Sequence, residues 1–319
     1  MFVGAADALA ADRVTLALNW KAQPELGGFY QALADGTYAE AGLEVSIKQG
    51  GPLVNNRPLL AFGQVDFLVG TNLLQAFDAV KQGIPTKVVA AFFQRDPQCI
   101  LAHADGPHRT WEDVAKAPLL MGNAGRQTFF LWMHSAHGFP RANLRPYNHS
   151  LAPFLNDKTA AMQGFVTAEP KRIEEATGRF PRVWLLADHG WSSYSTVLET
   201  RVDLIENRPE LVQRFIDASR TGWERYLDGK DSSAADALIK RDNPAITDEQ
   251  IAYSRQKMRE LGLLTSGDAA SAGIGVIRLE RVRRFYDDMT KAGMYKHGEI
   301  RPEDAVTLQF ISAQRAASR

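Results

Sequence analysis

Polar, aromatic and glycine residues stand directly after most of the apolar segments of this 319-residue chain. Such residues can bind a small molecule, because aromatic faces stack on flat rings while amides and carboxylates exchange hydrogen bonds with polar substituents. These residues contain no recognisable arrangement of catalytic groups, so we expect a binding site without catalytic residues. The predicted ligand-binding residues are Trp20, Glu25, Phe29, Gly51, Asn55, Thr71, Asn72, Gln94, Asn123, Arg126, Gln127, Glu169, Asp188, His189, Trp191 and Tyr194.

Trp20 is the main candidate for stacking on a ligand. It lies just past an alternating apolar segment and before the pair Gly27 and Gly28. Its indole either stacks on a flat ring or closes the core. The two glycines either give a ligand access or let a helix approach a strand closely. Phe29 and Tyr30 are adjacent on a predicted helix and face different directions, so at most one of them lines a cleft.

Glu169 and Arg126 favour different ligands. The carboxylate of Glu169 suits a cationic or NH-bearing group, although Pro170 after it favours an extended backbone and a plain turn. Arg126 follows glycines before a predicted helix, where a guanidinium and helix amides can hold a sulfonate, phosphate or carboxylate. Its alternative is a solvated loop arginine. Asn123 and Gln127 can bond either class of ligand.

The histidines do not form a recognisable metal motif. His134 and His137 are three residues apart on one predicted helix, and His149 and His189 lie elsewhere. Because the chain has neither an HExxH pattern nor clustered acids beside them, we expect no metal site, and no motif indicates a cofactor. The single cysteine, Cys99, cannot form a disulfide within the chain.

Composition excludes other classes of protein. The chain has 37 basic and 37 acidic residues, so it lacks the basic excess that nucleic-acid binding favours. No run of about 18 apolar residues is present, so no segment is expected to span a membrane. Ala8, Leu9 and Ala10 form a small-x-small pattern of the kind that precedes a signal-peptidase site. We interpret it as the tail of a secretion signal, with a mature chain from about Ala11; a flexible cloning remnant is the alternative.

The elements that must position these residues follow from periodicity. In the first part, strands are predicted at 13–20, 42–51, 65–70, 86–93 and 98–104, with helices at 27–36, 55–64 and 72–83. The second part has predicted strands at 118–122, 164–170 and 182–188, with helices at 111–118, 127–138 and 158–164. Three long helices follow, at 209–227, 248–261 and 275–291.

This alternation predicts an α/β protein whose sheets are mainly parallel and flanked by helices. No Gly-, Ser- or Pro-rich linker separates the parts, so we expect two lobes joined by close crossings, with a cleft between them. The first lobe is predicted to comprise 13–102 and 199–319, and the second 103–198, with 1–12 a disordered remnant. In such sheets, ligands bind beyond the carboxyl ends of the strands, where the residues named above stand.

Four stretches also carry a resemblance to a known family. They read LNWKAQPELGGFYQALADGTYAEAGLEVSIKQGG, GQVDFLVGTNLLQAFDAVKQGIPTKVVAAFFQRDP, GFVTAEPKRI and ADHGWSSYSTVLET. In this order, they resemble the substrate-binding proteins of ABC importers of the pyrimidine-precursor and sulfonate type, from about Arg13 to Lys291. The resemblance implies a two-lobed periplasmic-binding-protein fold of type II, with two hinge crossings, that closes on its ligand. It also implies that Trp20 stacks on a pyrimidine ring and that Glu169 bonds its substituents.

The expected function is therefore that of a monomeric periplasmic receptor, which delivers a small heteroaromatic nutrient to an ABC permease. A pyrimidine precursor of thiamine is the leading ligand, and no nucleic acid is expected as a partner. An organic anion such as an alkanesulfonate, held by Arg126, is the alternative within the binding class. The alternative from another class is an enzyme resembling a pyrimidine synthase, in which His189 together with Asp188 would be the catalytic residues. That family branch carries a run of cysteines and histidines that Cys99 alone does not match.

Overall fold

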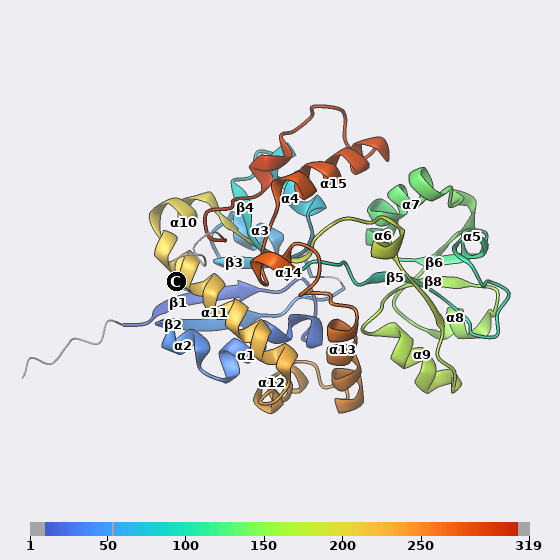
Figure 1. Cartoon of the computed structure of the whole chain (residues 1–319), viewed down its shortest axis with the longest axis horizontal. Helices are drawn as coiled ribbons and strands as arrows, with labels where there is room; N and C mark the ends of the chain where they lie inside the picture. The colour runs from blue at the N-terminus through green and yellow to red at the C-terminus, as the bar shows by residue number, and fades with distance from the viewer. Residues whose placement is uncertain (1–9, 53, 312–319) are drawn as a thin grey trace, which may run out of the picture.

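The computed structural model describes residues 10–52 and 54–311 (Figure 1). Four amino-terminal strands and one later strand form a five-stranded sheet. Its order is β2 (Leu43–Lys48), β1 (Asp12–Ala17), β3 (Phe67–Asn72), β10 (Ser195–Arg201) and β4 (Thr86–Phe93). The predicted parallel pairing is confirmed for β2 and β3 on β1. β10 runs antiparallel between β3 and β4, because the chain returns from the second lobe to fill that position.

The second sheet also has five strands. Its order is β7 (Leu144–Pro146), β6 (Leu119–Met121), β8 (Ala161–Phe165), β5 (Gln98–Ala102) and β9 (Arg182–Leu185). The predicted helix at 158–164 is wrong, because most of that segment is β8, which pairs with β5 and β6. A short apolar run does not reveal its periodicity, and only these non-local pairings decide between helix and strand.

Helices surround both sheets. Those of the first lobe are α1 (Gly27–Ala34), α2 (Thr37–Glu40), α3 (Arg57–Ala61), α4 (Leu74–Lys81), α10 (Val202–Asn207), α11 (Pro209–Asp228), α12 (Ser233–Asp242), α13 (Asp248–Glu260), α14 (Ala269–Ala272) and α15 (Leu279–Lys291), with 3-10 turns η1 (Pro24–Leu26) and η4 (Pro302–Ala305). Those of the second lobe are α5 (Trp111–Val114), α6 (Asn123–Gln127), α7 (Phe129–His137), α8 (Ala152–Asn156) and α9 (Glu169–Thr177), with η2 (Arg141–Asn143) and η3 (Leu186–His189). Within the described ranges, no helix has the length and apolar character needed to cross a membrane.

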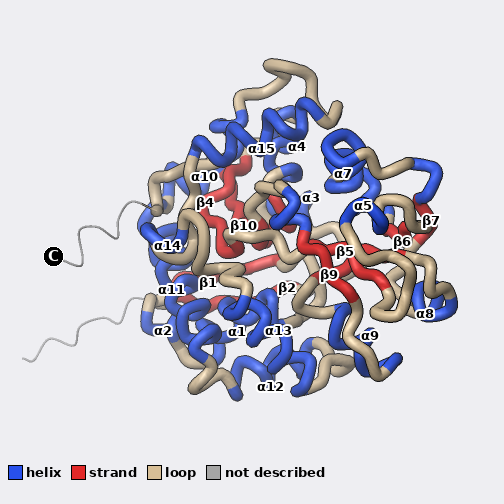
Figure 2. Tube along the Cα trace, turned by 45° about the vertical axis from the view of Figure 1, so that its right-hand side comes forward, coloured by secondary structure: helices blue, strands red, loops and turns tan. Residues whose placement is uncertain are grey.

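Helix α11 lies close against α1 on one face of the first sheet, and α4 and α15 cover the other face (Figure 2). Glycines permit this approach: a Cβ on Gly222 would lie 2.2 Å from the carbonyl oxygen of Gly28, and one on Gly28 would lie 2.2 Å from the Trp223 indole. Gly28 is thus needed for a helix-to-helix contact, whereas the two predicted alternatives were ligand access and a close helix-to-strand approach. Phe29 packs beside it against Phe92 and Trp223, at ring-centroid distances of 5.1 and 5.9 Å.

Two short crossings join the lobes, as predicted, but their positions differ from the prediction. β5 belongs to the second sheet and β10 to the first, so the crossings are residues 94–97 and 190–194. The boundaries predicted at 102/103 and 198/199 therefore assign β5 and residues 195–198 to the wrong lobes. Such boundaries depend on which sheet a strand joins, which local sequence does not specify. Of the remnant predicted at 1–12, residues 1–9 lie outside the described ranges, and Asp12 begins β1.

Candidate functional site

Aromatic rings from the two lobes meet between the sheets. Trp20 follows β1, and its ring centroid lies 5.4 Å from that of His149, which follows β7 in the second lobe. The ring of Tyr147 lies 5.1 Å from His149 on the same side. His149 has a φ of 66°. A left-handed backbone is uncommon for a residue other than glycine, and such strain is frequent at ligand-binding sites.

Two carboxyl groups reach the same place from opposite lobes. Glu25 lies in η1 and is 4% exposed. Burial raises its pKa to about 7, and the neighbouring Glu169 carboxylate adds to the increase. The Thr167 hydroxyl lies beside Glu25 and lowers this pKa in part, although it is outside normal hydrogen-bond geometry. We use "lobe junction" for the surroundings of Trp20, Glu25, Tyr147, His149, Thr167 and Glu169.

Glu169 is fixed by the backbone around it. Its Oε2 accepts a hydrogen bond of 2.7 Å from the Phe165 amide, and Arg172 lies 3.7 Å from its Oε1. Burial raises the pKa of Glu169, and the Phe165 amide, Arg172 and His149 each oppose that increase. The extended backbone predicted before Pro170 is wrong, because Glu169 is the first residue of α9 and the proline occupies the first turn, where its missing N–H costs nothing.

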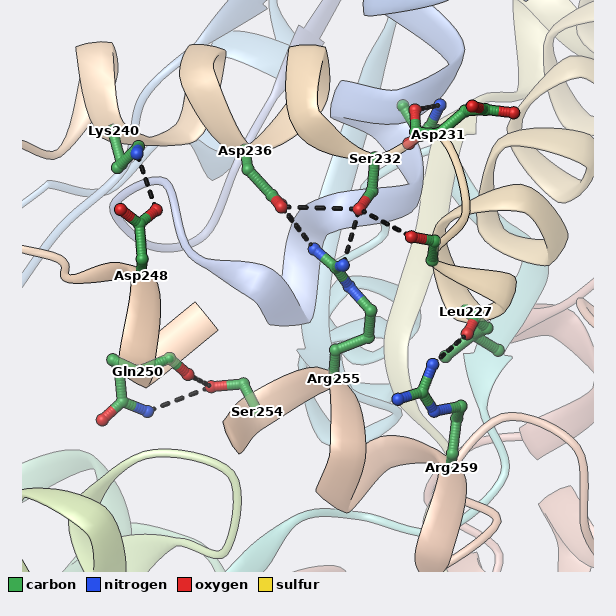
Figure 3. A network of polar contacts seen from close by, with 12 residues as sticks. Leu227, Asp231, Ser232, Asp236, Lys240, Asp248, Gln250, Ser254, Arg255 and Arg259 are labelled. Carbon is green, nitrogen blue, oxygen red and sulfur yellow. Dashed lines mark hydrogen bonds and ion pairs between the residues drawn. The ribbon is translucent and has the colours of Figure 1, made fainter. Parts of the chain in front are cut away.

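Helix α13 of the first lobe supports the segment that carries Thr167. Gln250 Nε2 and Ser254 Oγ donate hydrogen bonds of 2.8 and 2.7 Å to the Thr167 carbonyl, and the Tyr253 hydroxyl donates one of 3.0 Å to that of Val166. Figure 3 shows Gln250 and Ser254 side by side on α13. These bonds hold the start of α9 against the first lobe.

A polar network anchors α13 in turn. Arg255 Nη2 donates hydrogen bonds of 2.6 and 2.7 Å to the two carboxylate oxygens of Asp236 on α12, and its Nη1 donates one to Ser232 (Figure 3). The same guanidinium lies 4.5 Å from the ring centroid of Tyr226. A Cβ on Gly27, which follows η1, would lie 2.1 Å from that ring. The network thus anchors α13 and also lies beside Gly27, directly after the η1 turn that carries Glu25.

Several buried polar atoms at or near the lobe junction have no hydrogen-bond partner among the described residues. They include Glu25 Oε1, Thr167 Oγ1, the Tyr147 hydroxyl and Arg126 Nη2. An unsatisfied buried group costs about 1–3 kcal/mol, so native proteins seldom leave several of them together. A bound ligand that supplies complementary atoms would remove this cost.

Arg126 is anchored rather than freely solvated. Its Nε donates a hydrogen bond of 2.9 Å to the Met121 carbonyl. A Cβ on Gly122, just before α6, would lie 3.9 Å from His149 Nε2, so this segment borders the lobe junction. Asn123 and Gln127, also predicted to bind the ligand, lie exposed on α6.

The predicted residues at the ends of β1, β2 and β3 gather at one edge of the first sheet. Thr71 Oγ1 accepts a hydrogen bond of 3.0 Å from Asn19, which precedes Trp20. Asn72 accepts one from the Leu74 amide and so orders the start of α4. Gly51 forms a β-bridge with Val54. Asn55 is exposed, and its side chain accepts a hydrogen bond from the Arg57 amide.

Three predicted site residues instead belong to the core or the crossings. Phe29 is fully buried in the α1–α11 packing. Trp191 is buried, and its indole donates a hydrogen bond of 2.9 Å to Asp96 in the other crossing. Tyr194 donates one of 2.5 Å to Asp268. Residues of the crossings come directly after strands, as the predicted ligand-binding residues do. Position in the sequence therefore did not distinguish crossing residues from ligand-binding residues.

Gln94, Asp188 and His189 are also engaged elsewhere. Gln94 Nε2 donates to the carbonyls of Ala91 and Val276. Asp188, in η3, forms an ion pair with Arg95 in the first crossing. The ring of His189 stacks on Trp111 at a centroid distance of 4.0 Å, within the second lobe. Burial and the nearby His137 lower the pKa of His189.

Sequence reasoning missed Tyr147 and His149, because they follow a strand of only three residues that has no periodic signal. The two aromatic residues in PYNHS, one residue apart, were the available clue. His134 Nδ1 and His137 Nε2 lie 2.7 and 3.0 Å from the carbonyl oxygens of Phe139 and His189. No cluster of three or more His, Cys, Asp or Glu side chains suited to a metal ion occurs within 10–52 and 54–311.

Two hollows lie away from the lobe junction, one in each lobe. The larger, of about 380 Å³, lies beside β1, β2 and α3 and includes Thr15, Ser46 and Leu59 in its lining. The smaller, of about 230 Å³, is lined by His103, Asp105, Lys158 and Arg179, among others. Asp105 forms ion pairs with both cations of the smaller hollow, so neither charge is left uncompensated there.

Comparison with known proteins agrees with this architecture. The family model described as NMT1/THI5 like matches residues 23–231, more than half of the chain. The riboflavin-binding protein RibY of Chloroflexus aurantiacus is 25% identical over 309 residues, which cover 94% of this chain and 86% of RibY.

Solved structures share the fold at low sequence identity. A putative periplasmic sulfonate-binding protein SsuA of Methylobacillus flagellatus has a TM-score of 0.64 at 12% identity, over 95% of this chain and 94% of its own. The desulfurization enzyme DszB has a TM-score of 0.64 at 14% identity, over 97% of this chain and 100% of its own. The fold therefore occurs in both binding proteins and an enzyme. Together with the two five-stranded lobes, the match over residues 23–231 confirms the predicted resemblance: this chain belongs to the NMT1/THI5-like family.

Proposed function

We propose that this protein is the periplasmic substrate-binding component of an ABC importer and that it binds a flat heteroaromatic compound at the lobe junction. The observation that carries the proposal is the meeting of Trp20 with His149 between lobes, beside the carboxyl groups of Glu25 and Glu169. Aromatic faces favour a planar ligand, and carboxyl groups favour one with N–H donors at its edge.

A pyrimidine precursor of thiamine fits this chemistry, because it is flat and carries an amino group on its ring. Riboflavin, the ligand named for the relative RibY, offers a larger flat ring system with an N–H of its own. Both ligands need the same stacking surface and hydrogen-bond acceptors. The shared chemistry is thus a nitrogen-rich planar ring, and the pyrimidine remains the first ligand to test.

An organic anion such as an alkanesulfonate is the second candidate. Arg126 favours it, because the buried Nη2 has no hydrogen-bond partner among the described residues. The two carboxyl groups disfavour it, since a negative ligand placed beside them would meet repulsion in a poorly hydrated site. The heteroaromatic ligand is therefore preferred.

Ligand capture requires the lobes to move. The ligand binds one lobe first, and closure about the crossings at 94–97 and 190–194 then buries it and presents a closed monomer to the permease. Higher affinity for the closed form supplies the free energy for this shift.

A catalytic role is the alternative that DszB raises, because that enzyme has the same fold. The Asp188 and His189 pair considered for it is engaged otherwise, with Arg95 and Trp111 respectively. We therefore propose binding without turnover.

A thermal-shift screen tests the proposal. A ligand at about 100 times its dissociation constant stabilises the native state by about 2.7 kcal/mol. Stabilisation by aminopyrimidines or riboflavin, absent with alkanesulfonates, is the expected result. Stabilisation by sulfonates alone would overturn the heteroaromatic assignment and transfer the site to Arg126. Conversion of a bound compound into a new product, detected by mass spectrometry, would overturn the receptor assignment.

A further inference from the structure

Arg281 contacts both crossings between the lobes at once. It lies on α15, a helix rich in charged residues, yet its side chain is only 13% exposed. Its Nη2 donates hydrogen bonds to the carbonyls of Gln94 in the first crossing and Ser193 in the second. Its Nε donates one of 2.8 Å to the carbonyl of Ser192.

Two further contacts orient this guanidinium. It lies 4.1 Å from the ring centroid of Tyr194, the last residue of the second crossing. Its Nη1 lies 3.4 Å from the Asp268 carboxylate, which also accepts the hydrogen bond from Tyr194. Arginine suits this position because its planar fork can serve several carbonyls while its face stacks on a ring; a lysine ammonium offers neither feature.

The helix that carries Arg281 is fixed to the first lobe. Phe285 on α15 packs against Phe77 of α4, with ring centroids 6.1 Å apart, and Tyr286 packs against the same ring at 5.4 Å. Phe285 also meets the Trp191 ring edge-on at 5.0 Å. Helix α15 thus packs both against the second crossing and against the body of the first lobe.

The backbone just past the second crossing is strained. Thr196 has a φ of 49°, and a positive φ is a genuine outlier for a β-branched residue. Such a conformation persists only where neighbouring contacts impose it. The hydrogen bonds of Tyr194 to Asp268 and from the Arg278 amide, together with the Arg281 contacts, surround this position.

We propose that Arg281 is the positioning residue of the hinge, which ties both crossings to the first lobe and so sets the relative orientation of the lobes before ligand binds. The consequence for ligand affinity rests on the proposed receptor function, whereas the consequence for lobe orientation does not. Without Arg281, the crossings keep their covalent connection but lose their common anchor, and the lobes sample a wider range of orientations.

Electron paramagnetic resonance on the full chain tests this directly. Spin labels at Glu210→Cys on α11 and Glu175→Cys on α9 report the distance between lobes, since both positions are exposed and Cys99 is buried. In the absence of any ligand, Arg281→Ala is expected to broaden the distance distribution and shift its mean. Arg281→Lys, which retains the charge but not the fork, should have an intermediate effect.

Arg283→Ala is the matched control, because this arginine lies on the same helix and pairs with Glu303 at an exposed position. It should leave the distribution unchanged. A wild-type distribution in a cooperatively folded Arg281→Ala protein would overturn the proposal; if that variant does not fold, a wild-type distribution in Arg281→Lys would do so. A changed distribution in a protein that binds neither riboflavin nor pyrimidines would support the hinge role while overturning the heteroaromatic ligand assignment.

Discussion

The rings of Trp20 and His149 lie 5.4 Å apart and are tilted by 58°, although one residue belongs to each lobe. A flat ligand stacked between two rings needs a centroid separation of about 7 Å, because each face requires about 3.5 Å of contact distance. The observed separation is too short for a ligand ring to enter. Binding between these two residues therefore requires either lobe opening or displacement of His149, whose left-handed backbone is already strained.

Replacing Trp20 with alanine should weaken the binding of a flat heterocycle by about 10- to 100-fold. Stacking of a nucleic-acid base on an aromatic side chain is worth about 1–3 kcal/mol, and a heteroaromatic ligand offers a comparable face. Trp20→Phe should retain most of the affinity because it retains an aromatic face. Isothermal titration calorimetry with riboflavin and an aminopyrimidine measures both changes.

The control for Trp20 is Phe62→Ala, which removes an aromatic ring from the first lobe at a position that is 78% exposed. Its affinity should match that of the wild-type protein. If Trp20→Ala reduced binding of a heterocycle and of an aliphatic sulfonate equally, the stacking role would be wrong and Trp20 would act only through packing.

Glu25 should make stability depend on pH between about 4.5 and 7. The folded pKa is raised to about 7, whereas the ordinary value is 4.5, so the native state binds more protons than the unfolded state in this window. The free energy of unfolding therefore falls as pH rises from 4.5 to 7, by at most about 3 kcal/mol from this group. Glu25→Gln should remove that contribution and be more stable than the wild type above pH 7.

Urea denaturation of ligand-free protein at pH 5, 6, 7 and 8 measures this slope. Asp96 adds a slope of the same sign, because burial raises its pKa to about 6, so the informative quantity is the difference between wild type and variant. Glu44→Gln is the control, since Glu44 forms an exposed pair with Arg13. Equal slopes in the wild type and Glu25→Gln would show that Glu25 is solvated in the native protein.

The sequence predicted the architecture better than it predicted the site. Apolar segments identified β1 to β4: β1 alternates, whereas β3 and β4 are almost continuously buried apolar runs. β8 at 161–165 was missed because its strand character comes from pairing with β5 and β6. Trp20 and Glu25, predicted from their positions after β1, both lie at the lobe junction. Trp191 has an equivalent position after β9, but its indole bonds Asp96 in the hinge. Only the three-dimensional path of the chain decides whether such a tryptophan lies at the lobe junction or in the hinge.

Glu169→Gln should reduce affinity selectively for ligands that carry an amino group. In the wild type, the Phe165 backbone amide donates to Glu169 Oε2, and the glutamine side chain keeps an oxygen that can accept this bond. The hydrogen bond to the ligand's amino group, however, changes from a charge-assisted bond to a neutral one. The expected loss is about tenfold. Titration with an aminopyrimidine and with its analogue lacking the amino group measures the selectivity.

Glu174→Gln is the matched control for Glu169, because it lies on the same helix and pairs with Lys171. It should bind both ligands like the wild type. Unchanged affinity of Glu169→Gln for the aminopyrimidine would remove Glu169 from the ligand site and leave Glu25 as the acceptor to examine.

The pair of Arg255 and Asp236 should stabilise the protein far more than the pair of Lys240 and Asp248, although both connect α12 to the α13 segment (Figure 3). The side chains of the first pair are 11% and 18% exposed and bonded through two oxygens, whereas those of the second are 40% and 74% exposed. Removing one member of a buried pair leaves the other charge uncompensated, and a solvated pair has no such cost.

Double-mutant cycles with alanine, measured by urea denaturation, separate the two cases. A coupling energy of about 2–3 kcal/mol is expected for Arg255 and Asp236, against at most about 0.5 kcal/mol for Lys240 and Asp248. Because α13 holds the Thr167 carbonyl through Gln250 and Ser254, loss of Arg255 should also weaken riboflavin or pyrimidine binding without any contact to the ligand. Equal coupling in the two pairs would mean that solvent reaches Arg255 and that α13 is held by apolar packing alone.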